Sequence, residues 1–324
     1  MKAWCVERIT EAGEMQFRDL PDPVPGLGQY VVRVEAAGVN FLDTLIIRGR
    51  YQKKPPLPFT PGAEVAGTIL AAGEGATLAP GTRVLAAVET GGYAEAALVA
   101  QAATFELPDW MPAAEALALL GVNYPTSYYA LHHRAALRAG ETVLVHAGAG
   151  GVGSAAVQLA KAAGARVIAT AGSVEKLDVC RRLGADAVVS YGETDWVDAV
   201  RRLTDGRGAD VIYDPVGGEV GEQSLRALAW MGRYLVVGFA AGGISKLPAN
   251  RLLLSNGAAL GVFWGEVVNR DPATAASVRA ALTALYREGR IPPLIGGRYR
   301  LAEAPAALAA LAGRATVGKL VLEP

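Results

Sequence analysis

The stretch TVLVHAGAGGVGSAAVQLAKAAGARVIATA, residues 142–171, decides the fold of this chain. Its apolar start predicts a short strand over residues 142–147, and a run of glycines follows directly. A helical composition then covers residues 152–163, and a second apolar strand is expected over residues 166–171. A strand, a turn, a helix and a second strand in this order form one unit of a parallel sheet.

The glycines of this turn follow the G-x-G-x-x-G pattern at Gly148, Gly150 and Gly153. The chain must turn sharply there, bring backbone N–H groups to a pyrophosphate and pack the helix closely on the strand, and side chains would obstruct each step. The helix N-terminus adds unpaired donors and a partial positive charge. We therefore predict a dinucleotide site, and the alternative is a tight turn without a ligand. The predicted cofactor-binding residues of the turn are Gly148, Ala149, Gly150, Gly151, Val152 and Gly153.

Short strands and helices continue to alternate after this unit. We expect strands over residues 188–190, 209–213 and 234–237, and helices over residues 174–183, 196–203 and 221–228. An apolar segment at residues 258–263 is suited to close the sheet. This alternation predicts an α/β fold of the Rossmann type, a doubly wound parallel sheet with helices on both faces.

The beginning of the chain has a different pattern. Up to about residue 120, short apolar stretches at residues 30–34, 64–71 and 82–88 are separated by prolines and glycines. This spacing indicates a compact, strongly turned, β-rich unit.

The end of the chain does not continue the alternation either. After residue 265 we expect a helix over residues 273–288, a short alanine-rich helix and a last strand over residues 319–322. The predicted organisation is therefore a Rossmann domain at residues 122–265, inserted in a β-rich domain made of residues 1–121 and 266–324.

Composition narrows the class of protein. The 324 residues are 52% hydrophobic and carry 31 basic and 31 acidic side chains, so the net charge is zero and binding to nucleic acid is not expected. Only two cysteines occur, which excludes a disulfide scaffold and favours a cytoplasmic protein. No secretory signal opens the chain, and the longest stretch without charges is interrupted by glycines, so no membrane partner is expected. A small-molecule substrate fits this balance best.

The end of the second strand bears on the choice of dinucleotide. An NAD site usually has a carboxylate there that accepts a hydrogen bond from the ribose 2′-hydroxyl, but the stretch Thr170–Ala171–Gly172–Ser173 contains no acid. Ser173 and Lys176 instead offer a hydroxyl and a cation, which would welcome a 2′-phosphate. We therefore predict NADP(H), with NADPH as the reductant. The alternative is that Ser173 only caps a helix and Lys176 is a solvated surface residue.

The histidines do not indicate a metal site. His132 and His133 are adjacent and so point in different directions, His146 ends a strand, and none has metal-ligand spacing to a cysteine. We expect surface or hydrogen-bonded core roles for them, and no bound metal.

Several segments, taken together, resemble a known family. They are GVNFLD at residues 38–43, GRY at 49–51, PGAEVAG at 61–67, the glycine turn, DPVGG at 214–218 and GRAT at 313–316. In this order they resemble the zinc-independent quinone oxidoreductases of the medium-chain dehydrogenase/reductase superfamily, the relatives of zeta-crystallin. The resemblance extends from end to end and implies that the β-rich domain is a GroES-like catalytic domain.

The resemblance also accounts for the absence of zinc ligands. Zinc-dependent relatives carry a cysteine where Asn40 stands and a histidine where Ala63 stands. Without these two ligands, the usual three-ligand catalytic zinc site cannot be assembled.

The resemblance implies roles for individual residues. Asn40 would contact the nicotinamide ribose or the substrate oxygen, unless its amide only caps a local turn. Tyr51 would donate a hydrogen bond to the developing substrate oxygen, unless it is an aromatic packed beside the proline-rich loop. The further residues implied in cofactor binding are Asn123, Thr126, Tyr191, Val216, Gly238, Phe239, Phe263, Gly265 and Arg314. Among them, Tyr191 and Arg314 would complete the 2′-phosphate pocket, and Phe263 could equally be an interface or core aromatic.

These expectations together predict a zinc-independent, NADPH-dependent quinone oxidoreductase. Quinones and activated α,β-unsaturated carbonyls need little polarisation, because the charge that follows hydride addition spreads to a distant oxygen. One alternative is an enoyl-thioester reductase, for which Lys53 and Lys54 would offer a basic path. Another is a non-catalytic NADPH-binding protein. The family resemblance further implies a homodimer formed near residues 258–263.

Overall fold

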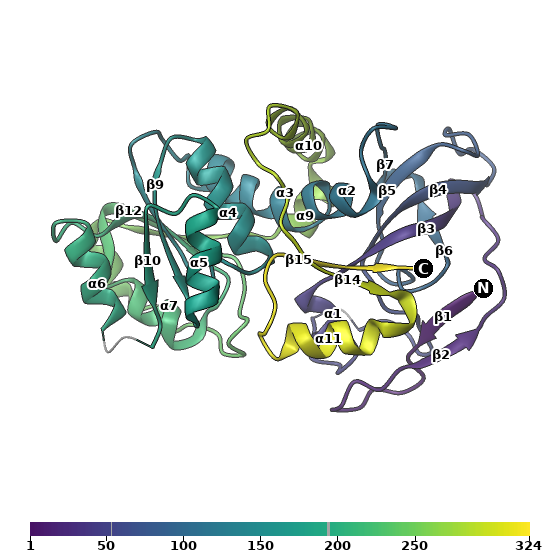
Figure 1. Cartoon of the computed structure of the whole chain (residues 1–324), viewed down its shortest axis with the longest axis horizontal. Coiled ribbons are helices and arrows are strands. Elements are labelled where there is room, and N and C mark those ends of the chain that lie inside the picture. Colours follow the sequence, from purple (N-terminus) through teal and green to yellow (C-terminus); the bar gives the residue numbers. More distant parts are fainter. Residues whose placement is uncertain (53, 193–194) are drawn as a thin grey trace. The chain divides into compact units, whose positions relative to one another are not determined.

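The computed structural model describes residues 1–52, 54–192 and 195–324. The chain divides into two compact units (Figure 1). The terminal unit consists of Met1–Val122 and Ile295–Pro324, and the central unit consists of Asn123–Leu294. In the part of the chain that is described, no helix is both long enough and apolar enough to cross a membrane.

The central unit is built on a parallel sheet with the strand order β10-β9-β8-β11-β12-β13. Every pair of neighbouring strands in it is parallel. The strands are β8 (Thr142–Val145), β9 (Arg166–Ala171), β10 (Ala187–Ser190), β11 (Ala209–Asp214), β12 (Leu228–Val236) and β13 (Ala258–Gly261). This order is that of a Rossmann fold, in which the direction of winding reverses between the two central strands, here β8 and β11.

Helices cover both faces of this sheet, as predicted. The helical segments of the central unit are α3 (Asn123–Tyr128), the π-helical turn η2 (Tyr129–Arg134), α4 (Gly151–Ala162), α5 (Val174–Arg182), α6 (Trp196–Leu203), α7 (Gly218–Ser224), α8 (Ala249–Ser255), α9 (Trp264–Arg270) and α10 (Pro272–Arg287). Ile168 of β9 belongs to the core cluster that includes Trp196 and Val200 of α6. The next residue, Ala169, points to the opposite face, where α4 and α5 pack on β9 (Figure 1).

Two expectations need correction in the central unit. The helix predicted over residues 221–228 ends at Ser224, and β12 begins at Leu228. The helix stops early because the Ala227 carbonyl already accepts a hydrogen bond, at 2.8 Å, from the Ala209 N–H of the neighbouring strand. The Rossmann domain does not end at residue 265 either. Helices α9 and α10 belong to the central unit, and α10 buries Val278 and Leu282 in packing that includes α3.

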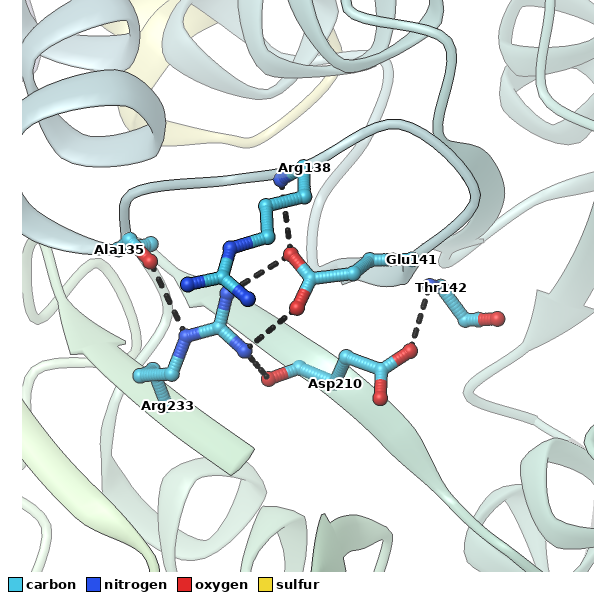
Figure 2. A network of polar contacts seen from close by, with 6 residues as sticks. All are labelled: Ala135, Arg138, Glu141, Thr142, Asp210 and Arg233. Atoms are coloured by element: carbon cyan, nitrogen blue, oxygen red, sulfur yellow. Dashed lines mark hydrogen bonds and ion pairs between the residues drawn. The ribbon is translucent and has the colours of Figure 1, made fainter. Parts of the chain in front are cut away.

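A bidentate ion pair joins the amino ends of the central strands (Figure 2). The Arg233 guanidinium donates to both Glu141 carboxylate oxygens at 2.9 and 2.8 Å, and its Nε donates to the Ala135 carbonyl at 3.1 Å. Asp210 Oδ2 accepts the Thr142 N–H at 2.7 Å. These contacts connect β8, β11 and β12 at the edge of the sheet opposite the glycine turn.

The terminal unit contains a second, mostly antiparallel sheet with the order β14-β15-β3-β4-β5-β7, with β6 also paired to β3. Its strands are β3 (Gln29–Val39), β4 (Glu64–Ala72), β5 (Arg83–Ala87), β6 (Ala96–Ala100), β7 (Thr104–Glu106), β14 (Ile295–Arg300) and β15 (Lys319–Glu323), and β1 (Lys2–Cys5) pairs separately with β2 (Gln16–Asp19). Its helices are α1 (Phe41–Ile46), α2 (Ala113–Leu120) and α11 (Ala304–Ala312), with 3-10 turns η1 (Gln101–Ala103) and η3 (Leu301–Glu303).

The two ends of the chain build this sheet together. Strand β15 runs antiparallel to β3, with Leu320 opposite Val39 and Leu322 opposite Ala37. Their apolar side chains share one buried core with those of β4 and β5. The architecture, a Rossmann sheet inserted in a GroES-like β-rich domain, is the predicted fold class.

Candidate functional site

The glycine turn connects β8 to α4 at the point where the sheet reverses its winding. Gly150 is the N-cap residue of α4, with an extended backbone (φ −76°, ψ 179°). A Cβ on Gly153 would overlap the Ala147 carbonyl oxygen, so only glycine lets the helix start this close to the strand end. A Cβ on Gly148 would lie 2.9 Å from the Ala169 Cβ atom and 3.0 Å from Cys180 Sγ. The turn is therefore a backbone cradle that leaves no room for side chains at Gly148 and Gly153.

Asn123 of α3 lies against this cradle. A Cβ on Gly151 would come within 2.6 Å of Asn123 Nδ2, and Asn123 itself is buried. One turn later, Ser127 Oγ lies 2.9 Å from the Val152 carbonyl and 2.8 Å from the Tyr213 hydroxyl. Thr126 is buried on the same short helix. The structure thus brings Asn123 and the turn together, although they are 25 or more residues apart in the sequence.

Ser173 and Lys176 occupy the start of α5, after β9. Ser173 is the N-cap residue, and its Oγ accepts the Lys176 N–H at 3.4 Å. Partial burial lowers the pKa of the Lys176 amine. The capping interpretation of Ser173 is therefore correct locally, and it leaves the side chain at the surface of the unit, half-buried.

Glu175 lies near Ser173 and was not among the residues predicted from the sequence. It stands in the first turn of α5, and its own backbone N–H, followed by the Ser173 hydroxyl, lowers the pKa of its carboxyl. The signal was present in the sequence, since an acid two residues after Ser173 falls in the same helical turn. A 2′-phosphate bound beside Ser173 would also be near this carboxylate.

Tyr191 follows β10 and is directed into the central unit. Its hydroxyl accepts the Ala147 N–H at 3.1 Å, and its ring stacks on His146 with a centroid separation of 5.9 Å. Burial raises the pKa of this phenol well above its usual range, and a hydrogen bond with Thr170 opposes that rise. The Tyr191 hydroxyl therefore supports the strand end that precedes the glycine turn.

His146 is a buried core residue, as expected. Its Nδ1 lies 2.9 Å from Thr170 Oγ1 and its Nε2 lies 2.8 Å from Ser224 Oγ, so both ring nitrogens are hydrogen-bonded. Burial lowers the pKa of His146 to about 4, which keeps the ring neutral near pH 7. The ring holds the ends of β8, β9 and α7 together.

The loops after β11 and β12 interlock beside the glycine turn. Asp214 Oδ1 accepts the N–H groups of Val216 at 2.7 Å and Gly217 at 3.0 Å. A Cβ on Gly217 would lie 2.7 Å from Phe239 Cδ1, and the Val216 carbonyl accepts a hydrogen bond from the second loop. Val216, Gly238 and Phe239 therefore lie together at the carboxyl edge of the sheet.

Phe263 and Gly265 lie further along this edge, after β13. Three inter-strand spacings separate β13 from β8, which amounts to roughly 14 Å. Phe263 is 59% exposed, so it is not a core aromatic of the central unit. These two residues can meet only the far end of a ligand that starts at the glycine turn.

In the terminal unit, Asn40 stands at the end of β3 as the N-cap residue of α1. Its side chain is held between two buried charges. Asn40 Nδ2 donates to Glu64 Oε1 at 2.8 Å, and Asn40 Oδ1 accepts from the Lys319 ammonium at 2.6 Å. Lys319 also forms an ion pair with Glu64 Oε1. The amide is therefore fixed by the protein itself.

A second carboxyl group supports the backbone of Asn40. Asp43 Oδ2 accepts the Asn40 N–H at 2.8 Å and the Tyr93 hydroxyl at 2.9 Å. Burial raises the pKa of Asp43 to about 7, although these two hydrogen bonds and the Lys319 charge oppose the rise. Asp43 is therefore poised to titrate near neutral pH.

The remaining predicted residues, Tyr51 and Arg314, also belong to the terminal unit. Tyr51 is half-buried and packs against the apolar core, in agreement with the aromatic-packing alternative. Arg314 is exposed between α11 and β15, with a left-handed backbone (φ 55°). Lys54 is exposed, and Lys53 lies outside the described residues.

Glu64 and Lys319 are candidate functional residues that were not predicted from the sequence. Glu64 belongs to the PGAEVAG segment and Lys319 begins the expected strand over residues 319–322, but neither was assigned a role. Each is a single charge at the start of an apolar strand, and each is almost fully buried, with 1% and 3% exposure. A lone charge at a core position of a strand is the signal that could have identified them.

Comparisons with known proteins agree with this architecture. Residues 26–109 match the model of the alcohol dehydrogenase GroES-like domain, and residues 151–291 match that of the zinc-binding dehydrogenase family. Quinone oxidoreductase-like protein 2 of Rattus norvegicus is 39% identical over 300 residues, which cover 91% of this chain and 85% of the rat protein.

Solved structures are similar over the whole chain. A mycobacterial protein complexed with NADPH is 35% identical with a TM-score of 0.93, and 100% of each chain is covered. The Escherichia coli quinone oxidoreductase complexed with NADPH is 28% identical with a TM-score of 0.92, again with 100% of each chain covered. Sequence and fold therefore agree along the full length, and the chain is an oxidoreductase that belongs to the quinone oxidoreductase family of the medium-chain dehydrogenase/reductase superfamily.

Proposed function

We propose that this protein uses NADPH to reduce a quinone or an activated α,β-unsaturated carbonyl without a catalytic metal ion. The observation that best supports NADPH binding is the glycine cradle of Gly148–Gly153, at the point where the sheet reverses its winding. Added Cβ atoms on Gly148, Gly151 and Gly153 would collide with neighbouring residues of the central unit, so glycine keeps the start of α4 close to the strand end. The backbone N–H groups at this helix start are suited to a pyrophosphate. The similar mycobacterial and E. coli proteins are both complexed with NADPH.

The rest of the cofactor would be held by groups already described. Ser173 and Lys176 would bind the 2′-phosphate, with Arg314 as a further cation. Asn123, Thr126 and Asn40 would contact the nicotinamide half, and the loop residues Val216, Gly238, Phe239, Phe263 and Gly265 would line its path. When bound, NADPH supplies the hydride, and the task of the chain is to orient the reactants and stabilise the oxygen that gains charge.

The chemistry of the site favours conjugated substrates. Asn40 offers an amide N–H and Tyr51 a phenol, and both are neutral hydrogen-bond donors. Such donors stabilise an oxyanion less than a metal ion does, so a simple ketone would lose several kcal/mol of assistance. A quinone or an enone needs less, because its charge spreads over a conjugated system.

The side chains around Asn40 do not fit a catalytic zinc ion, despite the description of the matched family model. Position 63 carries only the methyl group of Ala63. The Asn40 oxygen and Glu64 Oε1 both face the Lys319 ammonium, whose charge would repel a divalent cation. All three histidines belong to the central unit, and the one cysteine of the terminal unit, Cys5, lies in β1. Zinc independence rests on this donor set.

A homodimer located in the cytoplasm completes the proposal. Strand β13 is an edge strand of its sheet, and the neighbouring helix α8 exposes Leu253 and Leu254 at 80% and 75%. An apolar helix beside an open strand is suited to a second copy. Light scattering of the protein and of Leu253→Glu tests this point.

Cys5 and Cys180 are free thiols, which agrees with a reducing compartment.

Stopped-flow mixing tests the activity. The NADPH complex is mixed in turn with a quinone panel, an enone panel and an enoyl-thioester panel, and the absorbance of the reduced cofactor is followed. Oxidation by quinones or enones in metal-free buffer, with no gain on adding zinc, supports the proposal. Oxidation by the thioesters alone would make the protein an enoyl-thioester reductase. Tight NADPH binding without oxidation by any compound would make it a non-catalytic binder.

A further inference from the structure

Three polar side chains from three different strand ends meet in the interior of the terminal unit. They are Asn40 at the end of β3, Glu64 at the start of β4 and Lys319 at the start of β15, and their exposures are 6%, 1% and 3%. Lys319 is 255 residues from Glu64 in the chain, so only the folded sheet unites them. We call these three residues the amide triad.

The charges of the amide triad permit only one orientation of the Asn40 amide. The oxygen faces the Lys319 ammonium at 2.6 Å, and the nitrogen faces Glu64 Oε1 at 2.8 Å. A rotation by 180° would place the N–H groups against the ammonium and the oxygen against the carboxylate. Both contacts would then be repulsive in a buried place where charges are weakly screened. The second N–H of the Asn40 amide lies outside the triad and keeps a fixed direction.

The fold makes room for this arrangement. A Cβ on Gly38 would overlap Glu64 Oε1, and a Cβ on Gly121 would overlap Glu64 Oε2. Glu64 Oε2 is buried and accepts no hydrogen bond from the described residues. A buried ion pair with an unsatisfied oxygen costs more than apolar side chains of similar volume would. Stability alone does not explain the triad.

We propose that Lys319, paired with Glu64, is a positioning residue that fixes Asn40 as a hydrogen-bond donor toward the reactants. This inference rests on the proposed function, because it requires Asn40 to touch the nicotinamide ribose or the substrate oxygen. Lys319 then acts through Asn40 and not by contact with the substrate. Its charge holds the amide oxygen away from the reactants and leaves an N–H for the oxygen that gains charge.

A double-mutant cycle tests the proposal. The proteins are the wild type, Asn40→Ala, Lys319→Met and the combination of both, and single-turnover hydride transfer to the best quinone or enone is measured. Each single variant should be slower by about tenfold or more, and the combination should be no slower than Asn40→Ala, because groups that act through one another are not additive. NADPH affinity should change much less than the rate. Lys2→Met, at an exposed lysine paired with Asp19, is the matched control and should keep the wild-type rate.

Folding defects are separated by a further variant. Lys319→Met leaves Glu64 buried without a cation, so Lys319→Met/Glu64→Gln removes both charges and should restore thermal stability. The rate should stay low in this variant, because the orientation of the amide is still lost. Recovery of the wild-type rate together with stability would overturn the proposal, and so would multiplicative losses in the double-mutant cycle.

A readout without turnover keeps the test independent of the proposed function. In protein labelled with ¹⁵N-asparagine, the Asn40 side-chain amide signals are identified by their loss in Asn40→Ala. Two well-separated proton signals that move in Lys319→Met are expected from an amide held by the triad. If none of the tested compounds makes the wild type oxidise NADPH, the proposed function fails. The amide signals alone then decide whether the triad orients Asn40. Signals that are unchanged in Lys319→Met would contradict the inference.

Discussion

The carbonyl oxygen of Ala147 lies where a Cβ atom on Gly153 would have to be. Ala147 lies in the turn that follows β8 and has a left-handed backbone (φ 49°), and Gly153 is in the first turn of α4. This close approach sets how near the helix N-terminus comes to the strand end, and therefore where its N–H groups can meet a pyrophosphate.

Gly153→Ala should weaken both stability and cofactor binding. The added methyl group must push α4 away from β8, and overpacking of this kind costs about 1–3 kcal/mol. The N–H groups at the start of α4 then move, so NADPH affinity should fall as well. Thermal denaturation and NADPH fluorescence titration check this outcome. Gly192→Ala is the control, since a Cβ there meets only Ser190 Oγ, at an ordinary contact distance of 3.4 Å, and it should change neither quantity.

Ser173→Asp should shift cofactor preference from NADPH toward NADH. Aspartate is as good an N-cap residue as serine, so α5 should keep its capping bond, while the new charge repels a 2′-phosphate. The ratio of the two dissociation constants should change by about tenfold or more, since one charge-assisted hydrogen bond contributes about 1.5–3 kcal/mol. Ser173→Asn, which caps without a charge, is the control. An unchanged ratio in Ser173→Asp would place the 2′-phosphate elsewhere.

Breaking the ion pair of Figure 2 should destabilise the central unit without changing turnover. Arg233 and Glu141 are 20% and 21% exposed, so Arg233→Met leaves a partly buried carboxylate without its cation and should cost about 1–3 kcal/mol. Urea denaturation measures this loss. Arg8→Met, at the exposed pair of Arg8 with Glu14, should shift the midpoint little.

The contribution of Glu141 should also depend on pH. Burial raises the pKa of this carboxyl, but the Arg233 hydrogen bonds, the Arg138 N–H and the charges of both arginines together outweigh burial and leave the pKa below its ordinary value. A folded-state pKa that is lowered contributes stability above the unfolded pKa, and the contribution is lost as pH falls through the folded pKa. The difference between the wild type and Arg233→Met should therefore shrink in acid. A constant difference down to pH 3 would contradict the assignment.

Asp43 should act in the opposite sense. Burial raises the pKa of Asp43 from its ordinary value of 3.8 to about 7. Between these two pH values the folded protein keeps a proton on Asp43 that the unfolded chain has released. Unfolding then becomes easier as the pH rises between these two values. Asp43→Asn removes this titration. Between pH 4.5 and pH 7.5 the wild type should therefore lose a few kcal/mol more of its free energy of unfolding than Asp43→Asn loses. Parallel pH profiles of the two proteins would refute the raised pKa.

The elements of the central unit could be predicted because their signals are local. The expected strand over residues 166–171 and the expected helix over residues 196–203 agree with β9 (Arg166–Ala171) and α6 (Trp196–Leu203). Apolar runs, helix caps and the glycine pattern lie within a few residues of one another. The boundary at residue 265 was wrong because α10 joins the central unit through packing on α3, about 150 residues away in the chain, which no local pattern records.

By itself, the sequence determined the α/β architecture, the glycine turn with its anion-binding helix start, and the family. Only the tertiary structure decided the state of the chemical groups: that Tyr191 turns its hydroxyl to Ala147, and that Asn40 is held between Glu64 and Lys319. The physical reason is distance along the chain. Backbone geometry depends on neighbouring residues, whereas burial, the direction of an amide and a pKa depend on groups that meet only when β3, β4 and β15 pair in one sheet.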